Sequence, residues 1–525
     1  MTYRIVQPQK NGKYYLYEAR SVWNPEKKRS EQKRKYIGVC DEDGNLITAT
    51  TKNRTIECSP VYGPYYLMVE LMKQTGLDKE LIKVYGEDDG KRLMALSIIG
   101  VVSPCSTNQI RSEMEDTYLR ELLGVDWSFE ESEICRFLQR IGKDTGRKER
   151  IFGDLAPKDG CVLFDIVCLS TDSERMDYSE IGRKTHLTKA KQINLGMIHS
   201  MKDGLPFCYR TYPGSVADVT TLNNIVSDLK ELGCDDVELE MDRGFFSMRN
   251  VQMMIDNGMK YTVPIPSSNI LKLLISESVS EITSPLTTES LCDSVVRGFE
   301  SGVEIVDNKF ERSASQNRIR AVVFQDDDRR TKEISTLYRR LNELERSLTS
   351  MKYDRFIAKR LSVRELEMLN MLELSEAADG MFSVERKRNA ISAKENACGR
   401  FAVLTTSDKN WKDLLIQYRM RNDIEYDFSQ IQSDLFIGSK GKSTQESAEG
   451  GLFVNFLSLR LRLTLLERMR ASGLLDTMWI PDLLRVLKKL KISHIGDKWR
   501  LNEVTKAQRD IFEGLKIDPP HNEQT

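Results

Sequence analysis

Three hydrophobic patterns follow one another along the first half of this 525-residue chain. Residues 1–60 alternate aromatic or branched side chains with charged ones and turn at Asn11-Gly12 and Asp43-Gly44, which is typical of short strands and hairpins. From residue 61 to 158, apolar residues recur every three or four positions, as in YYLMVELMKQTG and SEICRFLQRIGKD, and this predicts helices. From Gly160 the segments CVLFDIVCLS, KQINLGMIHS and LPFCYRTYPG predict three strands.

Alternating helices and strands follow these three strands. Helices are predicted at VADVTTLNNIVSDLKELG and SMRNVQMMIDNG, and strands at DVELEMD and MKYTVPIP. The order β-β-β-α-β-α-β predicts the α/β fold class, with the mixed sheet of an RNase H-like core. The pattern breaks after residue 268 and returns with a strand at GRFAVLTT and a long helix from Trp411.

These changes of pattern divide the chain into six segments. We expect a basic β module (1–60), a helical, DNA-binding domain (61–158), the first part of a catalytic domain (159–268), an α+β insertion (269–397), the second part of the catalytic domain (398–470) and a helical C-terminal tail (471–525).

One helix of the insertion has a heptad-like apolar pattern. Its apolar residues step by three and four: Ile334, Leu337, Leu341, Leu344, Leu348 and Met351. The pattern fits a helical arm against a second subunit, but packing within the same chain is the interpretation we prefer.

Composition excludes several classes of protein. The chain is 40% hydrophobic and 30% charged, and none of its apolar runs reaches the ~18 residues that span a bilayer. The N-terminal residues lack the apolar centre of a signal peptide, so we expect a cytoplasmic protein with no membrane partner. Ten cysteines without a CxxC pair indicate neither a disulfide framework nor a zinc finger, and we expect them to be reduced.

Positive charge concentrates at the N-terminus, although the net charge of the chain is −1. The first forty residues hold ten Lys or Arg and three Glu, ten minus three giving +7. A basic segment with interleaved aromatics suits contact with a phosphate backbone, and a hairpin with a solvated basic face fits it equally well. The cations that we expect to contact DNA are Lys27, Lys28, Arg29, Lys33, Arg34 and Lys35.

Three acidic residues are the candidates for catalysis. Asp165 lies inside an apolar strand, where an ionised carboxylate costs several kcal/mol unless a partner or a metal compensates it. Asp242 ends the strand DVELEMD, which lies beside the first strand in an RNase H-like sheet. Two adjacent carboxylates repel each other unless a cation lies between them, and hard oxygen ligands suit Mg²⁺ or Mn²⁺. Taken alone, Asp165 fits a solvent-facing strand better than a metal ligand, and Asp242 fits an ordinary turn at the end of a strand.

The third acid, Glu425, belongs to the predicted long helix. Tyr418, Arg421 and Glu425 are spaced by three and four residues, which places them on one helix face. A glutamate can complete a two-metal site for phosphoryl transfer, an arginine can hold a phosphate, and a tyrosine can bond a phosphate or stack on a base. The alternative is an ordinary surface helix with an Arg421–Glu425 pair.

These elements together resemble the DDE transposases of insertion sequences. The stretches DIVCLSTD, TYPGSVADVTTL and EMDRGFFSMRN, the long insertion, and the Tyr-Arg-Glu spacing are similar to the group named for its Tyr-Arg-Glu-Lys signature. The resemblance covers residues from about 160 to 460. The lysine of that signature is replaced here by Gln432, which keeps hydrogen bonding and loses the charge.

The resemblance implies an enzyme that cuts the ends of an insertion sequence and joins them to target DNA by Mg²⁺-dependent phosphoryl transfer, with Mn²⁺ as a possible substitute. It implies that Asp165, Asp242 and Glu425 bind the metal, and that Tyr418, Arg421, Gln432 and Arg243 contact DNA. The implied partners are double-stranded DNA, both element ends and target, and a second copy of the chain when assembled on DNA. The implied location is the prokaryotic cytoplasm, at the nucleoid when the protein acts.

Two other functions stay open. A noncatalytic remnant would bind DNA without cutting it, and a nuclease of the same fold would cut without joining. His199 is expected to be a buried strand residue, and the GSKGKS sequence at 438–443 a basic loop with the wrong spacing for a P-loop. Asp172 and Asp177 are the acids that would replace Asp165 if the strand register differs.

Overall fold

The chain divides into two compact units. The structure is a computed structural model. It describes residues 2–8, 13–25, 27–46, 56–170, 178–181, 191–216, 221–278, 282, 288–291, 294–306, 309–313, 318–432, 444–495 and 498–521. The smaller unit comprises Met1–Pro60, Lys491–Glu503 and His521–Thr525, and the larger unit comprises Val61–Leu490 and Val504–Pro520.

The smaller unit contains two small antiparallel sheets. The first has the order β1 (Thr2–Pro8), β2 (Tyr14–Asn24) and β3 (Arg29–Cys40). The second has the order β19 (Lys498–Leu501), β18 (Ile492–Ile495) and β4 (Ile56–Cys58). The predicted turn at Asp43-Gly44 is confirmed: the Asp41 carboxylate accepts the N–H groups of Asp43 and Asn45, and Gly44 has φ 78°. The turn expected at Asn11-Gly12 lies outside the described residues.

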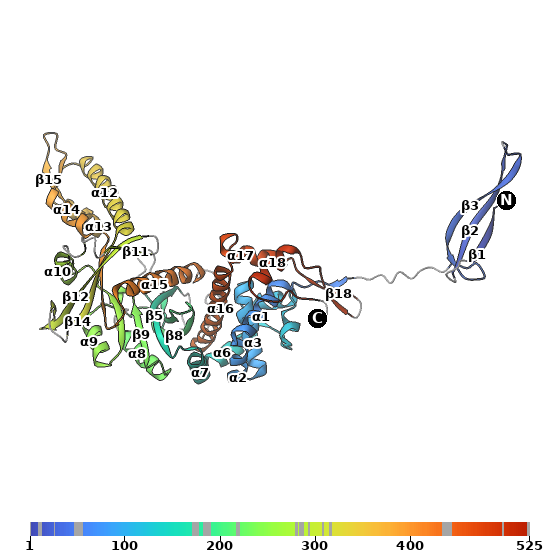
Figure 1. The fold of residues 1–525 in the computed structure, drawn as a ribbon, viewed down its shortest axis with the longest axis horizontal. Coiled ribbons are helices and arrows are strands. Elements are labelled where there is room, and N and C mark those ends of the chain that lie inside the picture. The colour runs from blue at the N-terminus through green and yellow to red at the C-terminus, as the bar shows by residue number, and fades with distance from the viewer. Residues whose placement is uncertain are drawn as a thin grey trace. The chain divides into compact units, whose positions relative to one another are not determined.

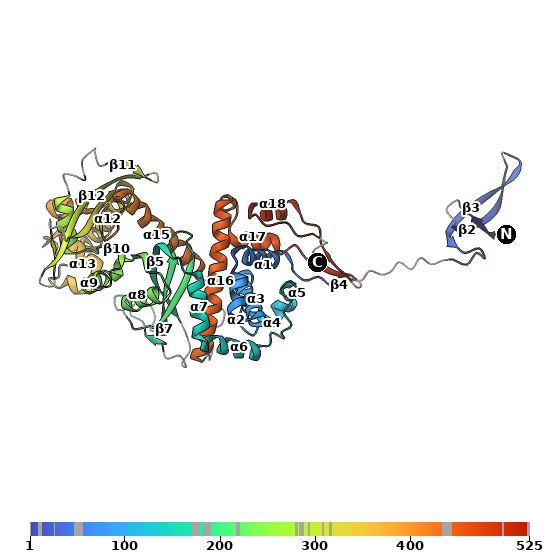
Figure 2. The same cartoon turned by 60° about the horizontal axis from the view of Figure 1, so that its bottom comes forward.

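The first part of the larger unit is helical, as the periodicity predicts. Its helices are α1 (Gly63–Thr75), α2 (Leu77–Tyr85), α3 (Glu87–Val102), α4 (Ile110–Glu115), α5 (Leu119–Leu123), α6 (Glu131–Lys143) and α7 (Thr145–Leu155). Helices from the other end of the chain join them: α16 (Gln445–Ala471), α17 (Ile480–Leu487) and α18 (Lys506–Gly514). Figure 2 shows α16 running beside α7, α3 and α1.

The second part of the larger unit is built on one sheet. Its elements follow the predicted order: β5 (Asp159–Ser170), β7 (Lys191–Ser200), β8 (Pro206–Pro213), α8 (Leu222–Glu231), β9 (Asp236–Met241), α9 (Met248–Asp256) and β10 (Lys260–Pro264). In space the strands lie in the order β8-β7-β5-β9-β10, with β7 antiparallel to β5 and β8, and with β5, β9 and β10 parallel. This is the RNase H-like arrangement (Figure 1).

Strands from beyond β10 extend the same sheet. The strand β17 (Arg400–Thr405) pairs antiparallel with both β10 and β14 (Ile319–Asp326), and β12 (Ser294–Val306) pairs with β14. The short strands β11 (Thr288–Leu291) and β13 (Lys309–Arg312) pair with β12, and β6 (Glu180–Ile181) pairs with β7. The helix α10 (Asn269–Glu277) precedes β11.

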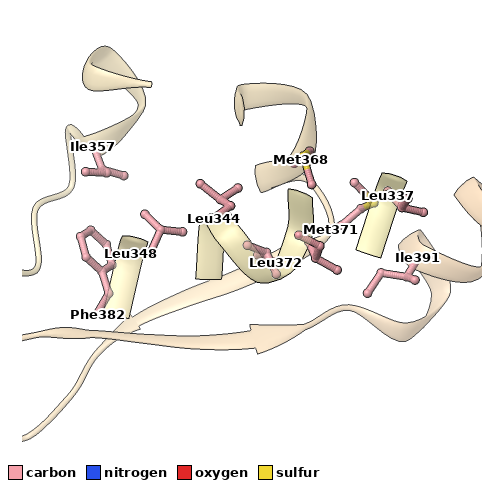
Figure 3. Close-up of a cluster of buried hydrophobic side chains, with 10 residues drawn as sticks. Leu337, Leu344, Leu348, Ile357, Met368, Met371, Leu372, Phe382 and Ile391 are labelled. Carbon is pink, nitrogen blue, oxygen red and sulfur yellow. The ribbon is translucent and has the colours of Figure 1, made fainter. Parts of the chain in front are cut away.

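The remaining elements form a small subdomain with its own core. They are α12 (Asp327–Thr349), α13 (Val363–Leu369), β15 (Leu372–Glu376), β16 (Phe382–Arg386) and α14 (Arg388–Ala397). Leu337, Leu341, Leu344 and Leu348 of α12 are buried against Phe382 and other residues of this subdomain (Figure 3). The heptad-like stripe therefore packs within the chain, as the preferred interpretation states.

The helices and the cysteines of the described residues can be checked for membrane spans and for disulfides. None of its helices is long and apolar enough to cross a bilayer. The nine cysteines within the described residues are all free, and Cys40, Cys208, Cys234 and Cys398 are buried.

Helices α6 and α16 touch through their backbones at two glycines. A methyl group at Gly142 of α6 would overlap the Glu446 carbonyl of α16, and one at Gly450 of α16 would overlap the Leu138 carbonyl of α6. Small residues at both crossing points let the helices approach more closely than side chains allow.

We predict that Gly450→Ala destabilises the larger unit by about 1–3 kcal/mol, because the added methyl group forces the two helices apart. Gly146→Ala in α7 is the matched control: its methyl group meets no atom within 4 Å, and alanine favours a helix by up to about 1 kcal/mol. Thermal unfolding compares the two variants. Equal melting temperatures would contradict the close approach of α6 and α16.

Candidate active site

Two of the candidate acids are neighbours across parallel strands. The register of β5 and β9 places Phe164 opposite Met241, so the next residues, Asp165 and Asp242, follow side by side. The Ile166 N–H donates to Asp165 Oδ1 at 2.8 Å. The sequence prediction that the fold brings these positions together agrees with this register.

Asp242 lies where the strand gives way to a turn. The 3-10 helix η2 (Arg243–Phe245) begins after it, and its carboxylate accepts the Gly244 N–H at 3.5 Å. Ser247 caps α9, as predicted, by accepting the Asn250 N–H at 3.1 Å. The Asp242 side chain is 42% exposed, so its carboxylate remains accessible from solvent. Arg243, an expected DNA contact, is exposed next to it.

The helix α15 (Trp411–Gln432) covers the face of the sheet to which these strands belong. Ile424 of α15 packs on Leu163 of β5, two residues before Asp165, and on Met201. Arg421 donates to the Met241 carbonyl at 3.2 Å, and its Nη2 lies 3.7 Å from Asp242 Oδ1. The predicted helix therefore meets both aspartate-bearing strands.

Arg421 and Tyr418 make contacts within the protein. Arg421 is 5% exposed, and its guanidinium lies over the Tyr418 ring at 4.7 Å. The Tyr418 ring stacks on Phe401 at 5.0 Å. In this arrangement a DNA phosphate could reach the Arg421 guanidinium only if the arginine side chain moved. The direct DNA contact expected of Arg421 therefore stays a prediction.

Several predicted residues are not described at the level of side chains. The backbone of α15 places Glu425 one turn beyond Arg421, and Gln432 is the last residue of the helix. The side chains of Glu425 and Gln432 lie outside the described residues, as do Asp172, Asp177 and the 438–443 loop.

A buried polar network, which the sequence prediction misses, connects α15 to the sheet. Gln417 Nε2 donates to Glu238 Oε1 at 2.9 Å and to Glu240 Oε2 at 3.0 Å. Lys409 Nζ donates to Glu238 Oε2 at 2.9 Å and to Gln417 Oε1 at 2.5 Å. Glu238 also accepts the hydroxyls of Thr262 and Ser407. The signal for this network is the VELEMD sequence, which places an acid at every second position of β9.

The two glutamates of the network differ in protonation. Burial raises the pKa of Glu240 to about 8, so this carboxyl is neutral at pH 7. Burial acts to raise the pKa of Glu238 too, but hydrogen bonds from Lys409 and Gln417 outweigh burial, so the pKa of Glu238 lies below its ordinary value. The network therefore holds one carboxylate and one carboxylic acid.

Cys161, Glu238 and Glu240 offer ligand atoms within 4.8 Å of one another. They fit a metal ion poorly. Both Glu238 oxygens already accept two hydrogen bonds each, one of them from an ammonium group. Burial also raises the pKa of the Cys161 thiol, which disfavours the thiolate that binds metals. Asp165 and Asp242 fit better, because both are carboxylates and Asp242 is partly exposed.

The basic residues of the smaller unit lie on different surfaces. Directly paired residues share a sheet face, and the pairs Arg20–Lys33 and Glu18–Lys35 place Lys33 and Lys35 on one face with Arg29. Arg34 pairs with Ala19 and lies on the opposite face, which carries exposed aromatic side chains. Those side chains are Tyr3, Trp23 and Tyr36. Lys27 and Lys28 are exposed in the turn between β2 and β3.

His199 is a buried strand residue, as expected. It is 2% exposed, and its Nδ1 lies 3.4 Å from the Gly204 carbonyl oxygen. Burial lowers its pKa to about 4, so the ring is neutral at physiological pH.

Two comparisons with known proteins find a similarity. Residues 158–372 match the family model described as Transposase DDE domain, which identifies a DDE-type transposase domain in this chain. The matched segment contains Asp165 and Asp242, and Glu425 lies beyond it. The chain is also similar to piggyBac transposase in a cryo-EM structure of its synaptic complex with hairpin DNA. That similarity has a TM-score of 0.38 and 9% identity, and covers 84% of this chain and 81% of the other. A comparison with curated proteins finds no match.

We predict that His199 makes the catalytic sheet sensitive to acid. Its pKa is about 4 in the folded chain and 6.5 in the unfolded chain. Its contribution to the free energy of unfolding is therefore complete above pH 6.5 and is lost as the pH falls from 6.5 towards 4. The difference corresponds to about 3 kcal/mol. Urea unfolding at pH 7 and pH 4 should show a smaller loss of stability in His199→Asn than in the unmodified chain. Parallel pH profiles would contradict a neutral buried ring.

Proposed function

We propose that this chain is a DNA transposase that cuts insertion-sequence ends and joins them to target DNA by two-metal-ion phosphoryl transfer. The observation that carries the proposal is the parallel register that makes Asp165 and Asp242 neighbours. The helix bearing Glu425 meets both strands at the same end of the sheet. The match of residues 158–372 to the Transposase DDE domain supports the same chemistry.

Each acidic residue has a stated role in this proposal. Asp165, Asp242 and Glu425 would hold Mg²⁺, or Mn²⁺ in its place, through carboxylate oxygens. The bound ions supply a nucleophilic water and neutralise charge on the phosphate. The partly exposed Asp242 carboxylate and the exposed Arg243 beside it face the solvent from which DNA approaches. In cleavage, a water oxygen would attack the phosphodiester at the element end and displace the 3′ oxygen, which leaves as a 3′ hydroxyl. In joining, that 3′ hydroxyl oxygen would attack a phosphate of the target strand and displace the target's own 3′ oxygen.

The smaller unit supplies a separate grip on DNA. The face of the β1-β2-β3 sheet that carries Arg20, Arg29, Lys33 and Lys35 offers cations to the phosphate backbone, with Lys27 and Lys28 at its end. Two copies of the chain would act together on paired element ends. In this proposal the protein works in the cytoplasm, at the nucleoid, on double-stranded DNA.

The catalytic assignment predicts the loss of both cleavage and joining in Asp165→Asn and Asp242→Asn protein. Removing one metal ligand should lower the rate by at least about 100-fold, because the ions lose the geometry that stabilises the transition state. A strand-transfer assay with element-end duplex, target plasmid and Mg²⁺ measures both steps. Asp203→Asn is a control, since Asp203 is an aspartate of the β7–β8 turn.

The same assay separates the other two functions. DNA binding without cleavage in Mg²⁺ and in Mn²⁺ would identify a noncatalytic remnant. Cleavage without joined products would identify a nuclease. Full activity in Asp165→Asn protein would remove the assigned chemistry.

The DNA grip predicts a difference between the two faces of the β1-β2-β3 sheet. Replacing Lys33 and Lys35 by Gln should lower the slope of log affinity against log salt concentration by about 0.9 for each phosphate that the protein no longer neutralises. Arg34→Gln is the matched control. The sequence expectation includes Arg34 among the DNA contacts, but the proposed surface excludes it because it lies on the opposite face, so this change should leave the slope unchanged. Titration of full-length protein with duplex DNA at several salt concentrations measures the slopes. An equal effect of Arg34→Gln would rule out the face-specific grip.

A further inference from the structure

Three side chains of α15 connect it to the sheet beside the two aspartates. Gln417, Arg421 and Ile424 are spaced by four and three residues, so they share one helix face. Gln417 bonds Glu238 and Glu240, Arg421 contacts Met241 and Asp242, and Ile424 packs on Leu163. These contacts advance along β9 towards its end and then cross to β5.

We propose that Gln417 and Arg421 are positioning residues of the active site. Together they fix the depth and rotation of α15 on β9, at the turn from which the helix backbone continues to Glu425. The inference rests on the proposed function, because it concerns the assembly of that metal site.

Gln417 is suited to this role because its side-chain amide both donates and accepts hydrogen bonds. The amide nitrogen donates to one carboxyl oxygen of each glutamate, and the amide oxygen accepts from Lys409. The side chain is 7% exposed, so it exchanges none of these bonds freely with water. A shift of the helix by one residue would break all three bonds in a buried environment, where water does not readily replace them.

Arg421 acts on the other side of the same turn. Its Nη1 holds the Met241 carbonyl at 3.2 Å, and its Nη2 faces Asp242 Oδ1 at 3.7 Å. The guanidinium thus ties α15 to the end of β9 and orients a carboxylate proposed to bind metal. Groups that orient a metal ligand in this way affect metal affinity by about 10–100-fold when they are mutated.

The helix contains a matched control for Arg421. Arg419 also donates to a carbonyl and a carboxylate: its Nη1 reaches the Leu291 carbonyl at 2.7 Å, and its Nη2 reaches Asp326 Oδ2 at 2.8 Å. Its partners belong to the strands that extend the sheet, away from Asp165 and Asp242. A lysine at either position keeps the charge but lacks the planar fork that holds two oxygens at once.

The experiment measures how much Mg²⁺ cleavage requires. Arg421→Lys and Gln417→Glu in the full chain should each raise the Mg²⁺ concentration for half-maximal cleavage about 10-fold, with duplex DNA affinity within twofold of the unmodified chain. Arg419→Lys should leave the Mg²⁺ midpoint unchanged.

Three outcomes would overturn the proposal. The Mg²⁺ midpoint could stay unchanged in Arg421→Lys and in Gln417→Glu. Arg421→Lys could weaken DNA binding alone, which would assign Arg421 to phosphate contact. Arg419→Lys could raise the midpoint equally, which would indicate general destabilisation. Retained cleavage in Asp165→Asn is a different result, because it removes the proposed function itself; thermal unfolding of each variant checks that it is folded.

Discussion

The active site depends on the parallel pairing of β5 with β9. Residues 165 and 242 are far apart in the sequence, and the register that sets Phe164 opposite Met241 is what makes them neighbours. A slip of one residue would turn one aspartate to the other face of the sheet, because side chains alternate along a strand. Every later feature of the site, including the helix that covers it, depends on this alignment.

The face of the sheet around the aspartates is unusual because it is both polar and covered. Glu238 and Glu240 are buried on β9, where carboxyl groups are costly unless they are hydrogen-bonded or neutral. Here one is bonded by an ammonium, an amide and two hydroxyls, and the other is protonated at neutral pH. An apolar interface could accept a helix in several positions. The polar partners instead match one position of α15, in which the Gln417 amide meets both glutamates.

The sequence predicted the order of strands, the neighbouring aspartates and the helix that meets them, because these follow from local periodicity and from one known topology. It did not predict which way α15 faces. The spacing of Tyr418 and Arg421 places them together, but spacing alone does not say whether their face meets solvent or sheet. The alternating acids of VELEMD are typical of a strand with one face in solvent, and nothing local reveals that a helix almost 180 residues later covers that face. An α+β insertion at 269–397 follows from the sequence, but the pairing of its strands into the same sheet does not.

The position of β17 has a consequence for synthesis of the chain. It fills the place between β10 and β14, and its Thr405 hydroxyl bonds Thr262, 143 residues earlier. The edge of β10 therefore stays open while the intervening segment is made, about 10 s at ordinary rates of translation. During that interval the nascent chain exposes a strand edge able to pair with another chain. The subdomain cored by α12 is made within this interval and can fold first. Its folding brings together the two strands that flank it in the sequence, β14 and β17.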